Sequence, residues 1–132
     1  MRVYTHVLDK TYEAATDLSA LQFTFVAPTT GVAGGPSCRV AAVTSGPGAL
    51  ILQNKPTQYK GAVCRIYGFS ELYVLGTAVP IVVGDYLKPG AGGKGVKCEA
   101  GDAYSAQAYE ASSADNDLIE VLCDRGTTVA AP

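Results

Sequence analysis

The hydrophobic positions of this chain fall into short runs that alternate with polar positions, and turns rich in Gly, Pro, Asn and Asp separate the runs. In the clearest run, Leu21–Ala27 (LQFTFVA), Leu21, Phe23 and Phe25 fall on one face and Gln, Thr and Val on the other. A period of two is typical of a β-strand, whose successive side chains point to opposite faces. We therefore predict a strand at Leu21–Ala27, followed by a loop over Pro28–Pro36.

The other apolar runs predict strands of the same kind. They are Ser37–Thr44, Leu50–Gln53, Ala62–Tyr67, Glu71–Leu75, Tyr86–Leu87, Gly95–Cys98 and Leu118–Cys123, with Gly68 and Gly76 as breaks, a tight turn at Ser45–Gly48 and an exposed loop or hairpin tip at Lys88–Lys94. Alternation predicts that Val121 faces the core and Glu120 faces outward. It also predicts that Arg65, between Cys64 and Ile66, points to solvent or to a partner.

The segment Tyr104–Ala111 is open between helix and strand. Its Ala, Gln and Glu residues are good helix formers, but it lies between turn signals at Gly101-Asp102 and Ala114–Asp117, at a spacing typical of a hairpin arm. The stretch Gly48–Gly68 has the same order as Ala106–Gly126, namely small residues, an apolar run, a polar turn and an apolar run ending at Gly. Because Ala49–Gln53 has the pattern of a strand, we favour a strand for Tyr104–Ala111 as well. About nine short strands then predict an all-β fold, a small antiparallel β-barrel or sandwich with little helix.

The two ends of the chain differ from this pattern. Apolar residues in Met1–Ser19 are too sparse for a core element, yet more frequent than in a disordered tail. We predict an extended N-terminal arm over residues 1–19 that docks on its own core or on another subunit; the alternative is a frayed terminus without a role. A single β domain over residues 20–126 and a tail over residues 127–132 complete the chain.

Composition favours a binding protein. Charged residues make up 17% of the 132 residues, whereas about 25% is usual, and low charge suits a surface that neighbours partly cover. The net charge of −2 leaves no basic footprint for nucleic acid. Eight Tyr, three Phe and no Trp are present; Tyr is enriched at interfaces, but it is also common at half-buried strand positions, and both explanations stay open.

The sequence shows neither the pattern of a membrane-spanning segment nor that of a secretory signal. No apolar run approaches the length of a membrane span, and the first residues lack the apolar centre of a secretory signal. We therefore expect no membrane partner and a protein that stays in the cytoplasm where it is made.

The sequence contains only weak candidates for catalytic, phosphate-binding or metal-binding residues. The single histidine, His6, lies in the sparse arm, where a surface position is more common than a catalytic one. The glycine-rich stretch Gly90–Gly95 (GAGGKG) lacks the Ser or Thr and the helix of a phosphate loop, and Asp115–Asp117 lacks the spacing of a calcium loop. Because the four cysteines, Cys38, Cys64, Cys98 and Cys123, form no C-x-x-C pair, we expect free buried thiols, with disulfides only if a particle is later oxidised. We expect no enzyme, no cofactor and no metal.

Several motifs taken together resemble one family. The order ALILQNKP, GAVCRIYG, VVGDYLKPGAGGKGVK and GDAYSAQAYEASSADNDLIEVLCDRG, from Asp17 to Gly126, resembles the capsid decoration (cement) proteins of tailed phages. Each motif alone consists of residues that are common in turns. The resemblance is specific only through the order and spacing of the motifs. Asn116 stands where the family usually has Gly and tolerates the same left-handed backbone. Cys64, Cys98 and Cys123 stand where aliphatic or small residues are usual.

The resemblance implies a β-tulip-like fold and a structural function. Such proteins sit on the outer surface of the virion head, typically as homotrimers at three-fold positions, and clamp neighbouring subunits of the major capsid protein after expansion. The implied location is the virion, after synthesis in the host cytoplasm. The alternative is a β-barrel ligand-binding or head-fibre base module that binds through Lys88–Lys94. The candidate contact residues are Arg2, Tyr4, His6, Tyr12 and Leu18 of the arm, with Arg39, Lys55 and Arg65 as further polar contacts.

Overall fold

The computed structural model describes residues 7–30 and 38–128, and these residues form nine β-strands and a short 3-10 turn. The strands are β1 (Leu8–Ala14), β2 (Phe25–Thr30), β3 (Cys38–Ala42), β4 (Leu50–Leu52), β5 (Gly61–Leu75), β6 (Tyr86–Pro89), β7 (Gly95–Lys97), β8 (Ala103–Ala108) and β9 (Asp115–Thr127), with the 3-10 turn η1 (Ala91–Gly93) between β6 and β7. The prediction of an all-β barrel with little helix is confirmed.

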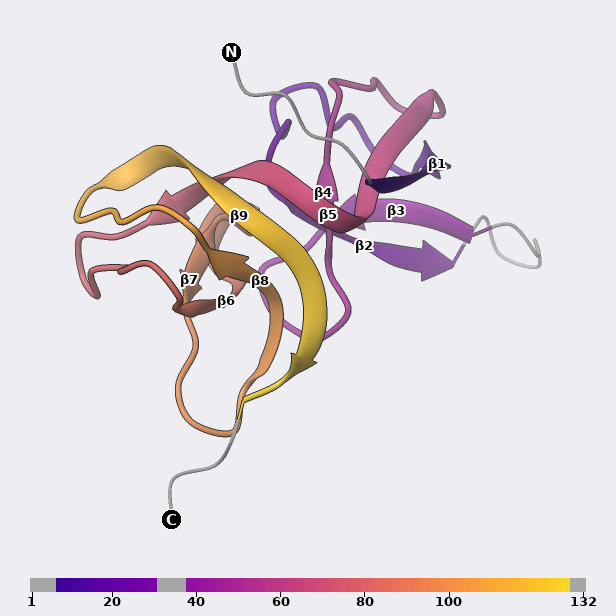
Figure 1. Ribbon diagram of the computed structural model, residues 1–132. Helices are drawn as coiled ribbons and strands as arrows, with labels where there is room; N and C mark the ends of the chain where they lie inside the picture. Colours follow the sequence, from indigo (N-terminus) through magenta and orange to yellow (C-terminus); the bar gives the residue numbers. More distant parts are fainter. Residues whose placement is uncertain (1–6, 31–37, 129–132) are drawn as a thin grey trace.

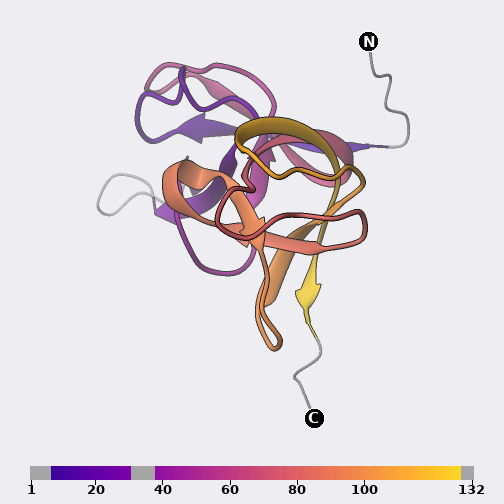
Figure 2. The same cartoon turned by 90° about the vertical axis from the view of Figure 1, so that its left-hand side faces the viewer.

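The strand pairings close into two rings that share β5 (Figure 1). Ring A runs β1-β3-β2-β4-β5 and returns to β1, and ring B runs β5-β7-β6-β8-β9 and returns to β5. Most neighbours are antiparallel, but β1 pairs with β3 in parallel, as does β5 with β7. In Figure 2 the orange strands and the end of the yellow strand β9 lie lower in the view than the indigo strand β1. Closure leaves few strand edges free to pair with other chains.

The shared strand β5 corrects a prediction. We expected Gly68 to end one strand and a second strand to begin at Glu71, but β5 is continuous over 15 residues. Gly68 has φ +116°, a conformation that favours glycine. The strand can therefore bend there while it still pairs, through residues 61–67 with β1 and through residues 68–75 with β9.

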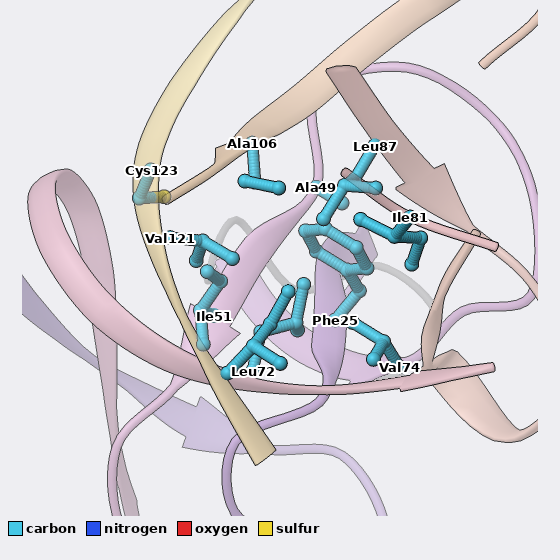
Figure 3. Packing of buried hydrophobic residues seen from close by; sticks show 12 residues of the cluster. Phe25, Ala49, Ile51, Leu72, Val74, Ile81, Leu87, Ala106, Val121 and Cys123 are labelled. Carbon is cyan, nitrogen blue, oxygen red and sulfur yellow. The ribbon is translucent and has the colours of Figure 1, made fainter. Parts of the chain in front are cut away.

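Each ring has its own apolar core. The core of ring B contains Phe25, Ala49, Ile51, Leu72, Val74, Ile81, Leu87, Ala106, Ala108, Ile119, Val121 and Cys123, and Figure 3 shows how these side chains converge on one another. The core of ring A contains Ala14, Leu18, Val26, Val40, Leu50, Leu52, Ala62 and Cys64. Strands β2 and β4 contribute to both cores, because their alternate residues face opposite sides. These two strands form a wall between the cores.

The predicted strand at Leu21–Ala27 is wrong in its first half. Phe23 has φ +62°, outside the strand region, and Thr24 donates its hydroxyl hydrogen bond to the carbonyl oxygen of Leu21 at 2.7 Å. A turn therefore occupies residues 21–24, and the strand begins only at Phe25. Phe25 and Val26 are both buried because they face the cores of ring B and ring A, respectively. Strand β2 then continues into the predicted loop as far as Thr30.

The N-terminal arm is, in its described part, a strand of ring A. Strand β1 pairs with β3 and β5, and Ala14 and Leu18 are fully buried in the ring A core. The prediction that this stretch is too sparse for a core element is wrong, because pairing on both sides of β1 supplies backbone hydrogen bonds where apolar side chains are few. Of the two docking alternatives, residues 8–18 take the one on their own core.

Later elements follow the sequence more closely. Strand β8 confirms the strand interpretation of Tyr104–Ala111 over most of its length. Val121 is buried and Glu120 partly exposed, as alternation predicted. Asn116 has φ +64°, the left-handed conformation expected where the family usually has Gly. The Lys88–Lys94 stretch forms the end of β6 and the β6–β7 hairpin, in which Ala91 and Gly92 are exposed.

Candidate partner-binding face

A row of paired side chains crosses four strands on the outer surface of ring B. Phe69 of β5 pairs with Leu122 of β9, Leu122 pairs with Gln107 of β8, and Gln107 pairs with Tyr86 of β6. Residues that lie opposite each other in paired strands project to the same face. Since the neighbours of these residues along each strand include core positions such as Leu87, the row projects outward. Three of the four residues in this row, Phe69, Leu122 and Tyr86, are therefore apolar or aromatic side chains on the outer surface of ring B, and Gln107 lies among them.

Two aromatic contacts widen the row into a patch. The rings of Tyr86 and Tyr104 have their centroids 4.2 Å apart at an interplanar angle of 31°, and those of Phe69 and Tyr109 lie 4.9 Å apart, edge to face. Tyr86 is 38% exposed and Tyr109 is 44% exposed. We call Phe69, Tyr86, Tyr104, Tyr109 and Leu122 the aromatic face. Fixed rings lose little side-chain entropy on binding, which makes them effective contact residues.

Gly126 leaves room for the ring of Tyr104 because it has no side chain. It lies opposite Tyr104 in the β8–β9 pair, and a Cβ atom at Gly126 would lie 2.5 Å from the Tyr104 hydroxyl oxygen. The ring therefore lies directly over the glycine backbone, an arrangement known from aromatic–glycine pairs across strands. Desolvation, with smaller contributions from Tyr86 and Asp124, raises the pKa of Tyr104. The hydroxyl stays neutral at physiological pH.

A loop of exposed valines flanks the aromatic face. Val79, Val82 and Val83 are 53%, 55% and 64% exposed, whereas Ile81 between them is buried in the core of ring B. Ile81 exchanges two backbone hydrogen bonds with Ser112, and Gly84 donates one to Ala108, next to Tyr109. The loop is thus held against ring B while its valines face solvent. The exposed valines make this loop a candidate for contact with another molecule.

The predicted contact residues are not brought together. Arg2, Tyr4 and His6 lie outside the described residues. Leu18 is fully buried and Arg65 is 8% exposed, so the prediction that Arg65 points outward and the choice of Leu18 as a contact are both wrong.

The buried state of Arg65 has a direct cause. Its Nε and Nη2 donate hydrogen bonds to the two carboxylate oxygens of Asp9, at 2.7 and 3.0 Å, and Nη1 donates one to the carbonyl oxygen of Phe69. Strand β1 supplies this partner, and no local pattern predicted that Asp9 would lie beside Arg65.

The other predicted contacts stay at the surface of ring A or beside it. Tyr12 packs against the ring A core, and Arg39 Nε lies 2.7 Å from Glu13 Oε1. Lys55 is exposed next to Tyr73. The sequence analysis missed the aromatic face and the valine loop. The excess of Tyr and the pair Val82-Val83 before a turn were the available signals.

The thiols of Cys64, Cys98 and Cys123 are held in their neutral form by burial. Burial raises the pKa of the Cys64 thiol to about 12 and those of Cys98 and Cys123 to about 11; thiols with such values are poor nucleophiles at neutral pH. All three are free thiols. Residues 7–30 and 38–128 contain no group of His, Cys, Asp and Glu side chains suited to a metal ion. In the same residues, no helix has the length and apolar character needed to cross a membrane.

The fold and the surface together define an all-β protein of two fused rings with an exposed aromatic patch. The fold is similar to that of the N base of the head fibre protein gp8.5 of bacteriophage phi29. The two structures superpose with a TM-score of 0.63 and 16% sequence identity, over 89% of this chain and 94% of that chain. At this identity the likeness concerns the fold. No protein-family model and no curated protein matches the chain.

Proposed function

We propose that this chain is a capsid decoration protein of a tailed phage. In this proposal it binds the outer surface of the head as a homotrimer at three-fold positions, contacts neighbouring major capsid subunits and catalyses no reaction. The observation that carries the proposal is the fold likeness to a phage head fibre base over most of both chains. The motifs that resemble decoration proteins support it independently.

The aromatic face and the valine loop supply the contact surface in this proposal. Interface centres are rich in Tyr and Phe and poor in charged residues, and Tyr86 and Tyr109 present such groups on a closed, rigid ring. The effect on the shell follows from linkage, because a protein that binds only the expanded shell stabilises it by mass action. Many copies, each touching more than one subunit, add multivalency.

Binding to heads tests the proposal. Purified protein is mixed with heads of the encoding phage that lack it, and occupancy is measured by co-sedimentation. The double variant Tyr86→Ser/Tyr109→Ser removes the two most exposed rings of the aromatic face. We expect at least a tenfold loss of affinity, because truncation of a central aromatic residue typically costs about 1–2 kcal/mol or more, and earlier release of DNA on heating.

The control is Tyr59→Ser on ring A, since Tyr59 is 59% exposed and lies outside the aromatic face. This variant should bind as the wild type does. Circular dichroism checks that all variants are folded. Absence of wild-type binding to heads would refute the decoration function, and unchanged binding of the double variant would refute the role of the aromatic face.

A second function is favoured by the same structural likeness, since the similar protein is the base of a head fibre. As a base module, the chain would bind its ligand through the β6–β7 hairpin. Lys88 is held there by Asp102 at 2.5 Å, and Gly93 packs against the carbonyl oxygen of Phe25, so Ala91 and Gly92 form the accessible tip. Ala91→Glu should then abolish ligand binding and leave the heat stability of the particle unchanged, whereas a decoration protein predicts no effect of Ala91→Glu.

A further inference from the structure

A groove with a lysine at each end lies beside Tyr73 of β5, where the turn over residues 19–24 meets ring B. Two hollows of about 200 Å³ and 370 Å³ meet at Ala20 and Tyr73, which line both of them. Lys55 lines the first hollow and Lys94 lines the second. We call this surface the Tyr73 groove.

The walls of the Tyr73 groove are fixed by backbone contacts. The Tyr73 amide donates a hydrogen bond to the carbonyl oxygen of Phe23 at 2.9 Å, and the Phe23 amide donates one to Leu52 at 2.8 Å. Phe23 holds its left-handed conformation between these two bonds. The turn is therefore anchored to both β4 and β5, and the groove is preformed, which lowers the entropic cost of binding.

The charge of the groove is positive at its two ends. The Lys94 ammonium donates a hydrogen bond to Asn116 Oδ1, a neutral acceptor, and a lysine has three donors. The nearby carboxylates accept hydrogen bonds from other groups: Asp115 accepts from the Thr77 amide at 3.1 Å, and Asp117 accepts from the Ser112 hydroxyl at 2.7 Å.

No carboxylate among residues 7–30 and 38–128 forms an ion pair with Lys55 or Lys94. This differs from the pattern at Lys88 and Lys97, which pair with Asp102 and Asp85. The lysines of the groove thus keep donors free for an anion, while Tyr73 between them offers an apolar surface with a polar tip.

We propose that the Tyr73 groove binds an extended acidic peptide segment of the shell protein. The proposal rests on the proposed decoration function, which supplies the partner, and it assigns the chemistry of one contact. Carboxylates of the segment would pair with Lys55 and Lys94, and an apolar side chain between them would lie on Tyr73.

Two lysine substitutions test the groove. The probe is a fluorescein-labelled peptide, Gly-Glu-Leu-Glu-Gly, and its binding is followed by fluorescence anisotropy at low salt. Lys55→Gln/Lys94→Gln should weaken binding about tenfold, because each exposed ion pair contributes roughly 0.5–1 kcal/mol. Lys60→Gln is the matched control, since Lys60 is exposed on the same β4–β5 connection but lines neither hollow. The same peptide with Gln in place of Glu loses the same two ion pairs and should also bind about tenfold more weakly.

The outcome separates this inference from the proposed function. If wild-type protein and Lys55→Gln/Lys94→Gln bind heads with equal affinity, the groove proposal is wrong and the decoration function stands. If the wild type binds the acidic peptide but not heads, the decoration function is wrong and the acidic specificity of the groove stands. A single-stranded oligonucleotide that binds more tightly than the peptide overturns the assignment to a protein segment.

Discussion

The pair of Arg65 and Asp9 shows how a charged residue becomes part of the barrel wall. The side chain of Arg65 is 10% exposed and that of Asp9 is 29% exposed, and two hydrogen bonds join them across the β1–β5 boundary. A buried guanidinium needs its partners, since an unpaired buried charge is far more costly than a paired one. The pair therefore fixes the pairing of β1 with β5 and closes ring A.

Asp9→Asn should lower the free energy of unfolding by about 2 kcal/mol, because it leaves the Arg65 charge without its counter-ion. Glu13→Gln is the matched control, as Glu13 also joins β1 to a neighbouring strand through an arginine but is 41% exposed. Its effect should stay below about 1 kcal/mol. Urea denaturation followed by circular dichroism measures both. Equal losses for the two variants would mean that burial of the Arg65 pair does not matter.

Single residues also decided where prediction from sequence failed. Alternation placed Glu120 and Val121 correctly, because a strand paired on both sides keeps its period of two. It failed at Phe23 and at Arg65, where the outcome depends on a left-handed backbone and on a carboxylate 56 residues away. Contacts of that range leave no mark in the local pattern, and the aromatic face was hidden for the same reason, since four separate strands build it.

At the scale of elements, β5 holds the two rings together and Gly68 is its critical position. A Cβ atom at Gly68 would lie 2.8 Å from Val7 Cγ1, and the φ of +116° is unfavourable for any residue with a Cβ. Gly68→Ala should therefore lower the free energy of unfolding by about 3 kcal/mol, from backbone strain and overlap together.

Two further variants separate these contributions to the Gly68→Ala loss. Gly101→Ala has a similar φ of +88° but open space around the added methyl group, so only strain, about 1 kcal/mol, should remain. Val7→Ala in the Gly68→Ala background should restore the part of the free energy of unfolding that is lost through steric overlap with Val7. Thermal denaturation with a double-mutant analysis gives these values, and a Gly68→Ala loss no larger than that of Gly101→Ala would rule out the contact with Val7.

The elements also show what a glycine in a strand pattern can mean. We interpreted Gly68 as a break because glycine often ends strands. However, β5 pairs with β1 before Gly68 and with β9 from Gly68 onward, so the strand continues through this residue. For Tyr104–Ala111 the turn signals outweighed helix propensity, and β8 confirmed them. Turn-forming residues identified the boundaries of most elements. Which strands become neighbours depends instead on closure of the rings, and closure is a property of the whole molecule.

At that largest scale, the wall formed by β2 and β4 couples the two rings. Phe25 and Ile51 face the ring B core while Val26 and Leu52 face the ring A core, so neither core can open without exposing the other side of the same strands. Together with the shared β5, this wall predicts that the chain unfolds as one cooperative unit, with no intermediate in which a single ring survives.

Substitutions in each core test this cooperativity. Leu72→Ala in ring B and Leu52→Ala in ring A should each lower the free energy of unfolding by about 3 kcal/mol, because both side chains are fully buried. For each variant, urea transitions monitored by far-ultraviolet circular dichroism and by tyrosine fluorescence should coincide, with the slope of the wild type. A variant that unfolds in two steps, or whose slope falls to about half, would show that one ring folds without the other.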